Sequence, residues 1–312
     1  MIPSALTRRN TDIHVHLIGM RGPYTGVVST PLLKSIPFTL LRKLQGIPLS
    51  DRGTMEDAYR SLLLKTVASS ENLDNIVLLA MDMVHTPSGR ALPEKTGIYT
   101  SNRYLFECAA SSDRILPGAS VHPFRRDALD RLTACAEKGA VLNKWIPSHM
   151  GFDPMDKRLA PFYRKLADLG LPLLTHTGTE HLLADHEPAG IHVARLRRAL
   201  DEGVTVIAAH SGGLRAFSTA GIRAFAAYTR SYPNLYGDTA AMANPWRSSH
   251  LRKLLDWGLE DRLLHGSDFP VSLPRWMSLF FVGFSGYEQI RNIRNPLDRD
   301  FLVKQIMFSK NR

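Results

Sequence analysis

The sequence lacks long apolar runs. No stretch of consecutive apolar residues approaches the roughly 18–20 that a membrane-spanning helix needs. The N-terminal segment 1–10 also lacks the apolar core of a secretory signal. We therefore expect a chain that neither spans nor binds a membrane and that stays in the cytoplasm.

Cysteine is scarce as well. Cys108 and Cys135 are the only two in 312 residues, and each lies in a helical pattern. In cytosolic proteins such residues usually serve as small buried hydrophobic side chains. The scarcity excludes a disulfide-based scaffold and favours a cytoplasmic location.

A basic stripe interleaved with aromatic residues is also missing, although the formal net charge is +10. The basic residues are instead scattered in pairs over predicted helices, as in Arg125-Arg126 and Arg197-Arg198. Scattered pairs are typical of solvated outer helix faces and not of nucleic-acid surfaces. We expect no nucleic-acid partner, while the positive charge is compatible with a small anionic substrate.

What is present is a short apolar, β-branched run followed by a helical stretch, repeated along the chain. The eight predicted strands are Asp12–His16, Asn75–Val84, Ile115–His122, Val141–Ile146, Pro172–His176, Val204–His210, Leu235–Thr239 and Arg262–Asp268. Near-continuous apolar strands are typical of parallel sheets, and eight such units predict a (β/α)8 TIM barrel. An open doubly wound sheet is disfavoured, because no G-x-G-x-x-G motif follows the first strand.

One long insertion interrupts the regular pattern, from Leu17 to Leu73 after the first strand. It is rich in proline and glycine and then predicts a helix capped by Thr54. Loops after barrel strands lie over the C-terminal mouth, where substrates bind. We see no linker or repeat, and we therefore predict a single domain over residues 1–312 with this insertion.

His14 and His16 lie two apart on the first predicted strand, so both imidazoles face the same side. An isolated H-x-H pair is a weak signal. Further residues of metal-ligating type end four other predicted strands: Lys144, His176, His210 and Asp268. The C-terminal ends of barrel strands converge on one mouth, and five strands would rarely place such residues there by accident.

Neutral imidazole and carboxylate suit a divalent ion such as Zn²⁺, with Mn²⁺ as the alternative. Such an ion lowers the pKa of bound water toward about 7. Asp268 is placed to accept the proton of that water and later to donate it to a leaving group. We interpret Asp12, at the start of the predicted strand, as a structural residue and not as a ligand.

The order Asp-x-His-x-His, Lys, His, His, Asp over residues 11–271 resembles the amidohydrolase superfamily. The segments Lys144-Trp-Ile-Pro147 with Gly151-Phe-Asp153, Leu171-Pro-Leu-Leu-Thr-His-Thr-Gly178 and His265-Gly-Ser-Asp-Phe-Pro270 resemble its amidohydrolase-2 branch of TIM-barrel metal-dependent hydrolases. The resemblance implies His14, His16, His176 and Asp268 as metal ligands, and Asp268 as the general acid and base. It implies His210 as a ligand or a catalytic group.

Two points stay open at the level of sequence. Lys144 either bears a carboxyl group that bridges two ions, as in binuclear members of the superfamily, or is a plain lysine beside one ion. The number of ions is therefore one or two. The sequence also leaves open whether the chain forms a homodimer.

Substrate-binding candidates follow or end the first, third and seventh predicted strands near the same mouth: Arg21, Tyr24, His122, Trp246 and Arg247. An arginine there could hold a substrate carboxylate with two hydrogen bonds. The leading hypothesis is a metal-dependent hydrolase that acts through metal-activated water on an amide, ester or lactone of a small anionic substrate.

The main alternative is non-oxidative decarboxylation of an aromatic or unsaturated carboxylic acid, which the same branch also carries out. A related metal-dependent DNase is disfavoured, because those enzymes carry a glutamate where Lys144 stands. A non-catalytic binding protein is disfavoured because every ligand type is present.

Overall fold

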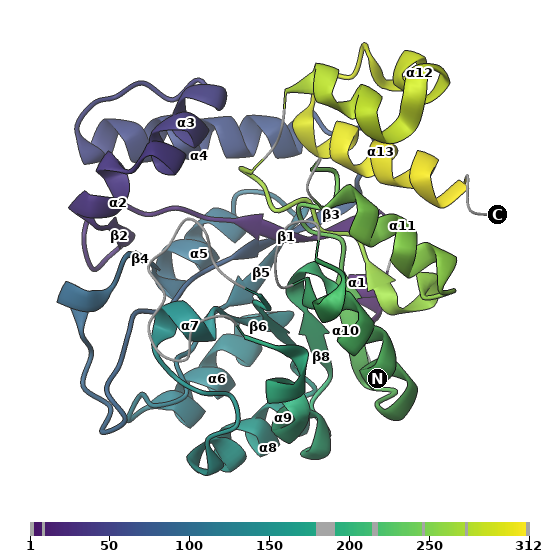
Figure 1. The fold of residues 1–312 in the computed structure, drawn as a ribbon. Coiled ribbons are helices and arrows are strands. Elements are labelled where there is room, and N and C mark those ends of the chain that lie inside the picture. The colour runs from purple at the N-terminus through teal and green to yellow at the C-terminus, as the bar shows by residue number, and fades with distance from the viewer. Residues whose placement is uncertain are drawn as a thin grey trace.

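The computed structural model describes residues 3–7, 10–178, 191–213, 218–244, 247–271 and 274–309. Within these residues one eight-stranded parallel sheet has the order β1-β3-β5-β6-β7-β8-β9-β10. Its strands are β1 (Thr11–His16), β3 (Asn75–Leu79), β5 (Ile115–Ala119), β6 (Leu142–Trp145), β7 (Leu173–Thr175), β8 (Val206–Ala208), β9 (Leu235–Asp238) and β10 (Leu263–Leu264). They lie at the centre of the molecule, with helices around them (Figure 1).

The first and last strands of this sheet meet and close it into a barrel. The amide of Asp268, just beyond β10, donates to the carbonyl of His14 at 2.9 Å, and the amide of His16 donates to Phe269 at 2.8 Å. Val15 and Phe269 form a parallel bridge. The predicted (β/α)8 barrel is therefore confirmed.

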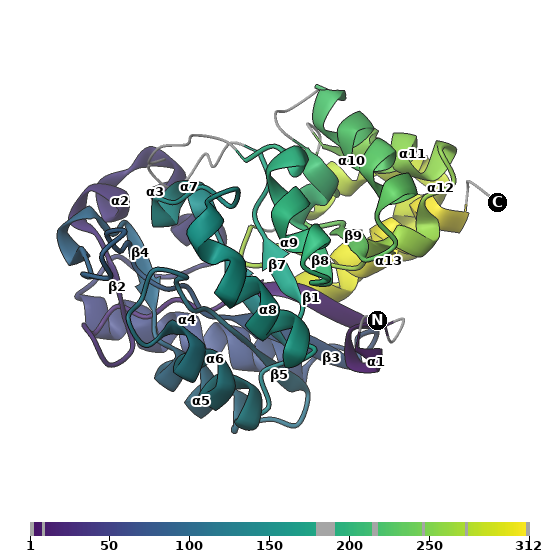
Figure 2. The same cartoon turned by 90° about the horizontal axis from the view of Figure 1, so that it is seen from below.

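Helices surround the barrel, and all but α1 come after the first strand. They are α1 (Ser4–Thr7), α2 (Thr30–Lys34), α3 (Ile36–Leu44), α4 (Arg52–Ala68), α5 (Asn102–Ala109), α6 (Ala128–Glu137), α7 (Pro147–Met150), α8 (Ala160–Asp168), α9 (Arg197–Asp201), α10 (Ala220–Ser231), α11 (Ser248–Asp256), α12 (Leu279–Ile290) and α13 (Pro296–Ser309). Seen from below, α4, α5, α6 and α8 cover one flank, and α9 to α13 cover the other (Figure 2). No helix among the described residues is long and apolar enough to cross a membrane.

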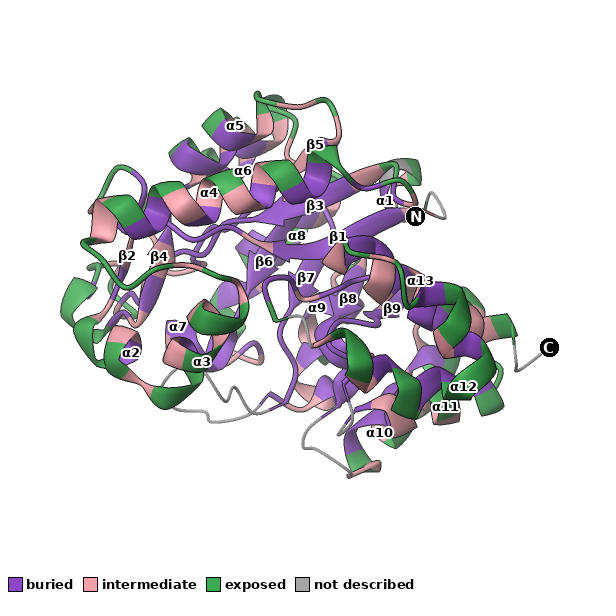
Figure 3. Ribbon diagram, turned by 90° about the horizontal axis from the view of Figure 1, so that it is seen from above, coloured by how far each residue is buried: buried purple, intermediate pink, exposed green. Residues whose placement is uncertain are grey.

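The barrel interior is layered along the strands. Leu142, Leu174 and Ile207 from β6, β7 and β8 form part of a small apolar cluster inside the barrel, which Leu6 of α1 joins. Because side chains alternate along a strand, the same inner face presents Lys144 and His176 two residues further on. Buried residues gather on the strands and exposed residues on the outer helices (Figure 3). An apolar floor therefore supports a polar upper layer.

The insertion after β1 contains α2, α3, α4 and the short strand β2 (Gly26–Val28), which pairs antiparallel with β4 (Ile98–Thr100). The prediction that Thr54 caps its long helix was wrong. Asp51 is the N-cap of α4, and its carboxylate accepts from the amide of Thr54 at 3.0 Å. The helix packs on the end of β1, where the Tyr59 hydroxyl donates to the carbonyl of His16.

Several predicted strands run longer than the observed ones. The prediction Val204–His210 shrinks to Val206–Ala208, and the prediction Arg262–Asp268 shrinks to Leu263–Leu264. His210 and Asp268 have left-handed φ values of 58° and 66°, so the backbone leaves the extended region before both residues. At these turns the side chains of His210 and Asp268 leave the alternating pattern of the strand and lie at the barrel mouth.

Candidate metal centre

Three side chains from opposite ends of the sequence converge at the barrel mouth. The Nε2 atoms of His14 and His16 are 3.2 Å apart. Asp268 Oδ1 lies 3.2 Å from His16 Nε2 and 3.5 Å from His14 Nε2. Among the described residues, this is the only group of three or more His, Cys, Asp or Glu side chains whose ligand atoms lie this close together.

The spacing of these three atoms fits a divalent ion. Ligand atoms about 2.0–2.1 Å from a tetrahedral ion lie roughly 3.3 Å from one another. The three observed distances bracket that value, and two imidazole nitrogens with one carboxylate oxygen are ligands that Zn²⁺ and Mn²⁺ both accept. His16 and Asp268 are 20% and 14% exposed, so the site is open on the mouth side.

Asp238 at the end of β9 orients His14 from behind. Its Oδ2 lies 2.7 Å from His14 Nδ1, and both side chains are buried. Because Nδ1 donates to this carboxylate, Nε2 of His14 keeps its lone pair for the site. Burial alone would raise the pKa of Asp238, but the neighbouring His14 holds it well below the usual range. The sequence reasoning missed Asp238, although a carboxylate at the end of a predicted strand was a signal for it.

His14 and Asp268 have electrostatic surroundings that suit ligands. Burial lowers the pKa of His14, and the charge of Lys144 lowers it further, so the imidazole is neutral. Burial would raise the pKa of Asp268, yet its hydrogen bond with His16 and the nearby imidazoles hold it well below the usual range. A neutral imidazole and an ionised carboxylate are the forms in which both residues bind metal.

Lys144 lies inside this group and is fully buried. Its Nζ is 3.0 Å from His14 Nε2, about the same as the spacing between the three converging atoms. Lys144 comes from the fourth strand of the barrel, β6, as the sequence predicted. The lysine nitrogen therefore borders the place that an ion would occupy.

His210 and His176 lie on the neighbouring side of the mouth. The ring of His210 is 5.7 Å from that of His14 and 4.9 Å from that of His176, measured between centroids. His210 Nδ1 lies 2.9 Å from the carbonyl of Ala240, which directs Nε2 toward the mouth. Neither His176 nor His210 belongs to the group of three ligand atoms. Their predicted roles as ligands remain predictions.

Asp12 holds the backbone that carries the site. Its Oδ1 accepts from the amides of His14 at 3.0 Å and Ser267 at 2.9 Å. Asp12 thus joins β1 to the segment that bears Asp268, and it stands outside the ligand group, consistent with the structural interpretation. Burial raises the pKa of Asp12 to about 7.

Two of the predicted substrate-binding residues, Arg21 and Tyr24, contact outer helices. Arg21 contacts α4 through the carbonyl of Gly53 at 3.0 Å and an ion pair with Asp57. Tyr24 donates to Glu107 of α5, and both side chains are more than 40% exposed. None of these interactions involves His14, His16 or Asp268.

Arg247 is nearly buried and acts electrostatically on His210. It is 8% exposed, and its charge contributes, after burial, to lowering the pKa of His210 well below the usual range. Trp246 lies outside the described residues. Of the predicted substrate-binding residues, Arg247 therefore has the clearest electrostatic link to the metal centre.

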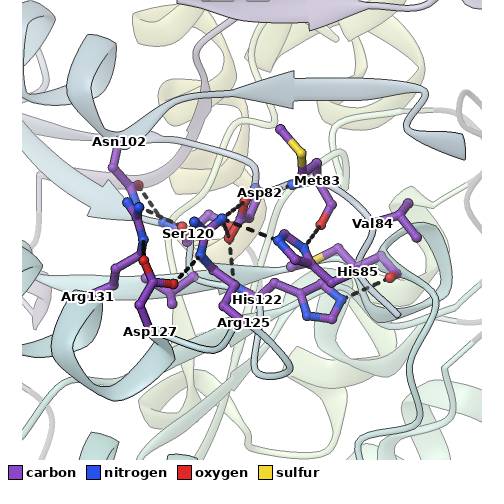
Figure 4. Close-up of polar contacts among 12 residues, drawn as sticks. Asp82, Met83, Val84, His85, Asn102, Ser120, His122, Arg125, Asp127 and Arg131 are labelled. Atoms are coloured by element: carbon purple, nitrogen blue, oxygen red, sulfur yellow. Dashed lines mark hydrogen bonds and ion pairs between the residues drawn. The ribbon is translucent and has the colours of Figure 1, made fainter. Parts of the chain in front are cut away.

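His122 belongs to a buried polar cluster at the ends of β3 and β5 (Figure 4). Its Nδ1 accepts from the amide of Phe124 at 3.1 Å, and its Nε2 lies 3.0 Å from the carbonyl of Met150. Both nitrogens are thus used within the protein. Burial lowers the pKa of His122 to about 3, so the ring is neutral.

Asp82 is the hub of this cluster (Figure 4). It accepts from the amide of His122 at 2.8 Å and from Arg125 Nη1 at 3.1 Å. Arg125 also reaches His85 Nε2 at 3.5 Å and Asp127 at 3.0 Å. The sequence reasoning did not find these contacts, which fix the loops after the second and third barrel strands.

Comparison with known proteins gives a family. The profile described as "Amidohydrolase" matches residues 71–298 of the chain. A search among curated proteins finds no match.

Solved structures resemble the whole barrel. A probable 2-pyrone-4,6-dicarboxylic acid hydrolase from Acinetobacter baumannii, with citric acid bound, is 13% identical with a TM-score of 0.57, over 97% of this chain and 94% of that one. A 2,6-dihydroxybenzoate decarboxylase from Rhizobium is 17% identical with a TM-score of 0.50, over 93% and 97%. A 5-carboxyvanillate decarboxylase from Novosphingobium aromaticivorans, with bound manganese, is 12% identical with a TM-score of 0.52, over 96% of each chain. At such low sequence identities, the similarity shows a shared fold only.

Proposed function

This chain belongs to the amidohydrolase family, and from that premise we propose that it is a metal-dependent enzyme acting on a small anionic molecule, either as a hydrolase of an amide, ester or lactone or as a non-oxidative decarboxylase. The observation that carries the proposal is the convergence of His14 Nε2, His16 Nε2 and Asp268 Oδ1 within 3.5 Å of one another. The structural neighbours include enzymes of both kinds, so neither reaction is preferred on their account.

We propose His14, His16 and Asp268 as the ligands of a divalent ion, with Zn²⁺ first and Mn²⁺ as the alternative. When bound, the ion would act as a Lewis acid and lower the pKa of a water molecule or hold a substrate oxygen. Manganese in one structural neighbour supports considering both metals. His176 and His210 are proposed as additional groups facing the same ion.

Asp268 is the proposed acid and base in both reactions. In hydrolysis its carboxylate takes a proton from the attacking water and returns it to the leaving group. In decarboxylation the carboxylate would first take up a proton from water or from a substrate hydroxyl, and it would then deliver that proton to the carbon from which carbon dioxide has left. Neutral His210 donates from Nδ1 to the carbonyl of Ala240, so its Nε2 carries a lone pair that can accept a hydrogen bond from a substrate hydroxyl. Arg247 is the proposed partner of a substrate carboxylate, because a guanidinium binds carboxylates with two hydrogen bonds.

One experiment tests the proposal and separates the two reactions. The purified protein, reconstituted with Zn²⁺ or Mn²⁺, is screened with lactones, esters and amides bearing carboxylates and with hydroxybenzoates. Hydrolysis incorporates ¹⁸O from labelled water into the organic product, whereas decarboxylation releases carbon dioxide and leaves the organic product unlabelled. Failure in both screens, together with no uptake of either metal, would refute the proposed function.

We also propose that the enzyme forms a homodimer through an apolar surface on η6 (Arg275–Ser278) and α12. Trp276, Phe280 and Phe284 are 59%, 66% and 74% exposed. Since an aromatic side chain buries about 150–250 Å², these three offer on the order of 400 Å², which is about half of the roughly 800 Å² per partner in a standard interface. Light scattering should give the mass of a dimer, and the double variant Phe280→Ser, Phe284→Ser that of a monomer. A monomeric wild-type protein would refute this interface.

The cytoplasm is the proposed compartment. Cys108 and Cys135 are both buried free thiols, as is usual in a reducing environment.

A further inference from the structure

The C-terminal helix α13 places a buried charge against the segment that carries Asp268. Lys304 is 1% exposed, and its Nζ donates to the carbonyl of Gly266 at 2.7 Å. Asp300, one turn earlier on the same helix, forms an ion pair with Lys304. A buried ammonium group is costly unless it is paired and hydrogen-bonded, so these contacts define where the lysine can lie.

Gly266 begins the turn that aims Asp268 at the metal centre. A Cβ on Gly266 would lie 2.9 Å from the Cβ of His14, so the backbone passes as close to β1 as a glycine allows. Two residues later Asp268 has a φ of 66°, which is uncommon for a residue other than glycine. Such a conformation persists only where the surroundings hold it.

Other contacts of this turn come from β1 and from the residue after β9, since the amide of Gly266 donates to Thr239 Oγ1 at 3.3 Å. The amide of Ser267 donates to Asp12 at 2.9 Å, and the amide of Asp268 donates to the carbonyl of His14 at 2.9 Å. Lys304 adds a hydrogen bond to the carbonyl of Gly266, from the side of the outer helix. The turn is therefore held by the first barrel strand, by Thr239 after β9 and by α13.

We propose that Lys304 is a positioning residue, which holds the carbonyl of Gly266 and thereby fixes the Asp268 carboxylate opposite His14 and His16. The expected effect on metal affinity rests on the proposed metal-dependent function, whereas the expected effect on the geometry of the turn does not. If the lysine merely docked α13 on the barrel, its loss would weaken folding without changing the geometry of the turn.

The chain offers a matched control on the same helix. Asp298 is 3% exposed and accepts from Ser70 Oγ at 2.5 Å and from the amides of Glu71 and Asn72 at 2.9 and 3.0 Å. These contacts attach the start of α13 to the segment before β3, and none involves the turn from Gly266 to Asp268. Replacement of Asp298 therefore perturbs the docking of α13 without removing the contact to Gly266.

The test compares Lys304→Met with Asp298→Asn in the full-length protein. Zn²⁺ affinity is measured by competition with a chelator, and amide hydrogen exchange is followed over residues 266–269. Both variants should lose stability. We expect Lys304→Met alone to bind Zn²⁺ about tenfold or more weakly, as for other groups that orient ligands, and to exchange faster at Ser267 and Asp268. Wild-type affinity and exchange in Lys304→Met, or equal changes in Asp298→Asn, would overturn the proposal.

Two further comparisons keep the test decisive. If Lys304→Met does not fold, Lys304→Gln retains a neutral donor and should show the same changes in weaker form. The exchange measurement needs no metal. A wild-type protein that takes up no Zn²⁺ would therefore count against the proposed function, while exchange at Ser267 and Asp268 would still decide the role of Lys304.

Discussion

Asp238 Oδ2 lies 2.7 Å from Nδ1 of His14, although the two residues are 224 positions apart in the sequence. The carboxylate fixes the tautomer of His14 and so decides which nitrogen faces His16 and Asp268. The same side chain accepts from the amide of His210 at 2.7 Å through its other oxygen. One buried carboxylate thus organises two histidines of the candidate metal centre.

We therefore expect Asp238→Asn to weaken metal binding. An amide oxygen can still accept from His14 but carries no charge, so affinity should fall by about 10–100-fold. Chelator competition with Zn²⁺ would measure the change, and Asp298→Asn serves as an equally buried control remote from the site. Unchanged affinity would show that Asp238 does not govern His14.

Metal content provides the second prediction. The purified protein should contain Zn²⁺ or Mn²⁺, or take it up on reconstitution, because three ligand atoms lie at the spacing that such ions require. His14→Ala should lose metal and activity together, since the remaining pair cannot hold the ion as firmly. Elemental analysis of both proteins measures this. A metal-free wild-type protein that resists reconstitution would disprove the site.

Asp268→Asn should separate folding from chemistry. The amide is close in size to the carboxylate, so the barrel should keep its circular dichroism spectrum, but it cannot exchange a proton. Loss of an acid and base step costs about 10²–10⁴-fold in rate, and loss of a charged ligand adds to this. Steady-state kinetics at saturating metal would measure the deficit. Wild-type kinetics in the variant would remove Asp268 from the proposed role.

His122 should make folding sensitive to acid. Burial lowers its pKa from 6.5 to about 3, so between these values the unfolded chain binds a proton that the folded one does not. The free energy of unfolding therefore carries no penalty from His122 above pH 6.5. As the pH falls from 6.5 toward 3, it decreases by up to about 1.4 kcal/mol per pH unit. The neighbouring charges of His85 and Arg125 further oppose protonation.

Chemical denaturation at several pH values tests this expectation. The free energy of unfolding of the wild type should fall more steeply below pH 6.5 than that of His122→Phe, which removes the titrating ring. Parallel pH profiles of the two proteins would contradict it.

The sequence allowed the barrel to be predicted because its strands are buried on both faces. Val206–Ala208 is apolar on both sides, and this pattern distinguishes barrel strands from the amphipathic helices between them. The spacing of His14 and His16 could be read directly, because residues two apart on a strand share a face. Asp268 was found because a turn signal follows it.

Asp238, Asp82 and Lys304 could not be assigned in the same way. The role of each depends on which atom of a distant residue it meets: His14 Nδ1, Arg125 Nη1 or the carbonyl of Gly266. No periodicity encodes such a contact. Lys304 in particular would be read as an exposed residue on an outer helix, whereas packing of α13 buries it.

The last prediction concerns Lys144, for which the sequence left two states open. Its Nζ is 3.0 Å from His14 Nε2, and the side chain is fully buried. A carboxyl group added to Nζ would need space beside the imidazole of His14, so a bridge between two ions would require the lysine to withdraw. We therefore expect an unmodified Lys144 beside a single ion.

Elemental analysis should then approach one metal per chain, and a crystal structure of the metal-loaded protein should show one ion and no extra density on the amine. Lys144→Ala should not be rescued by short carboxylic acids, because no carbamate oxygens would be missing. Two ions about 3.5–4 Å apart, with density on Nζ and rescue by acetate, would contradict the expectation. The outcome also bears on the reaction, since a single ion with a free lysine amine would favour the decarboxylase alternative.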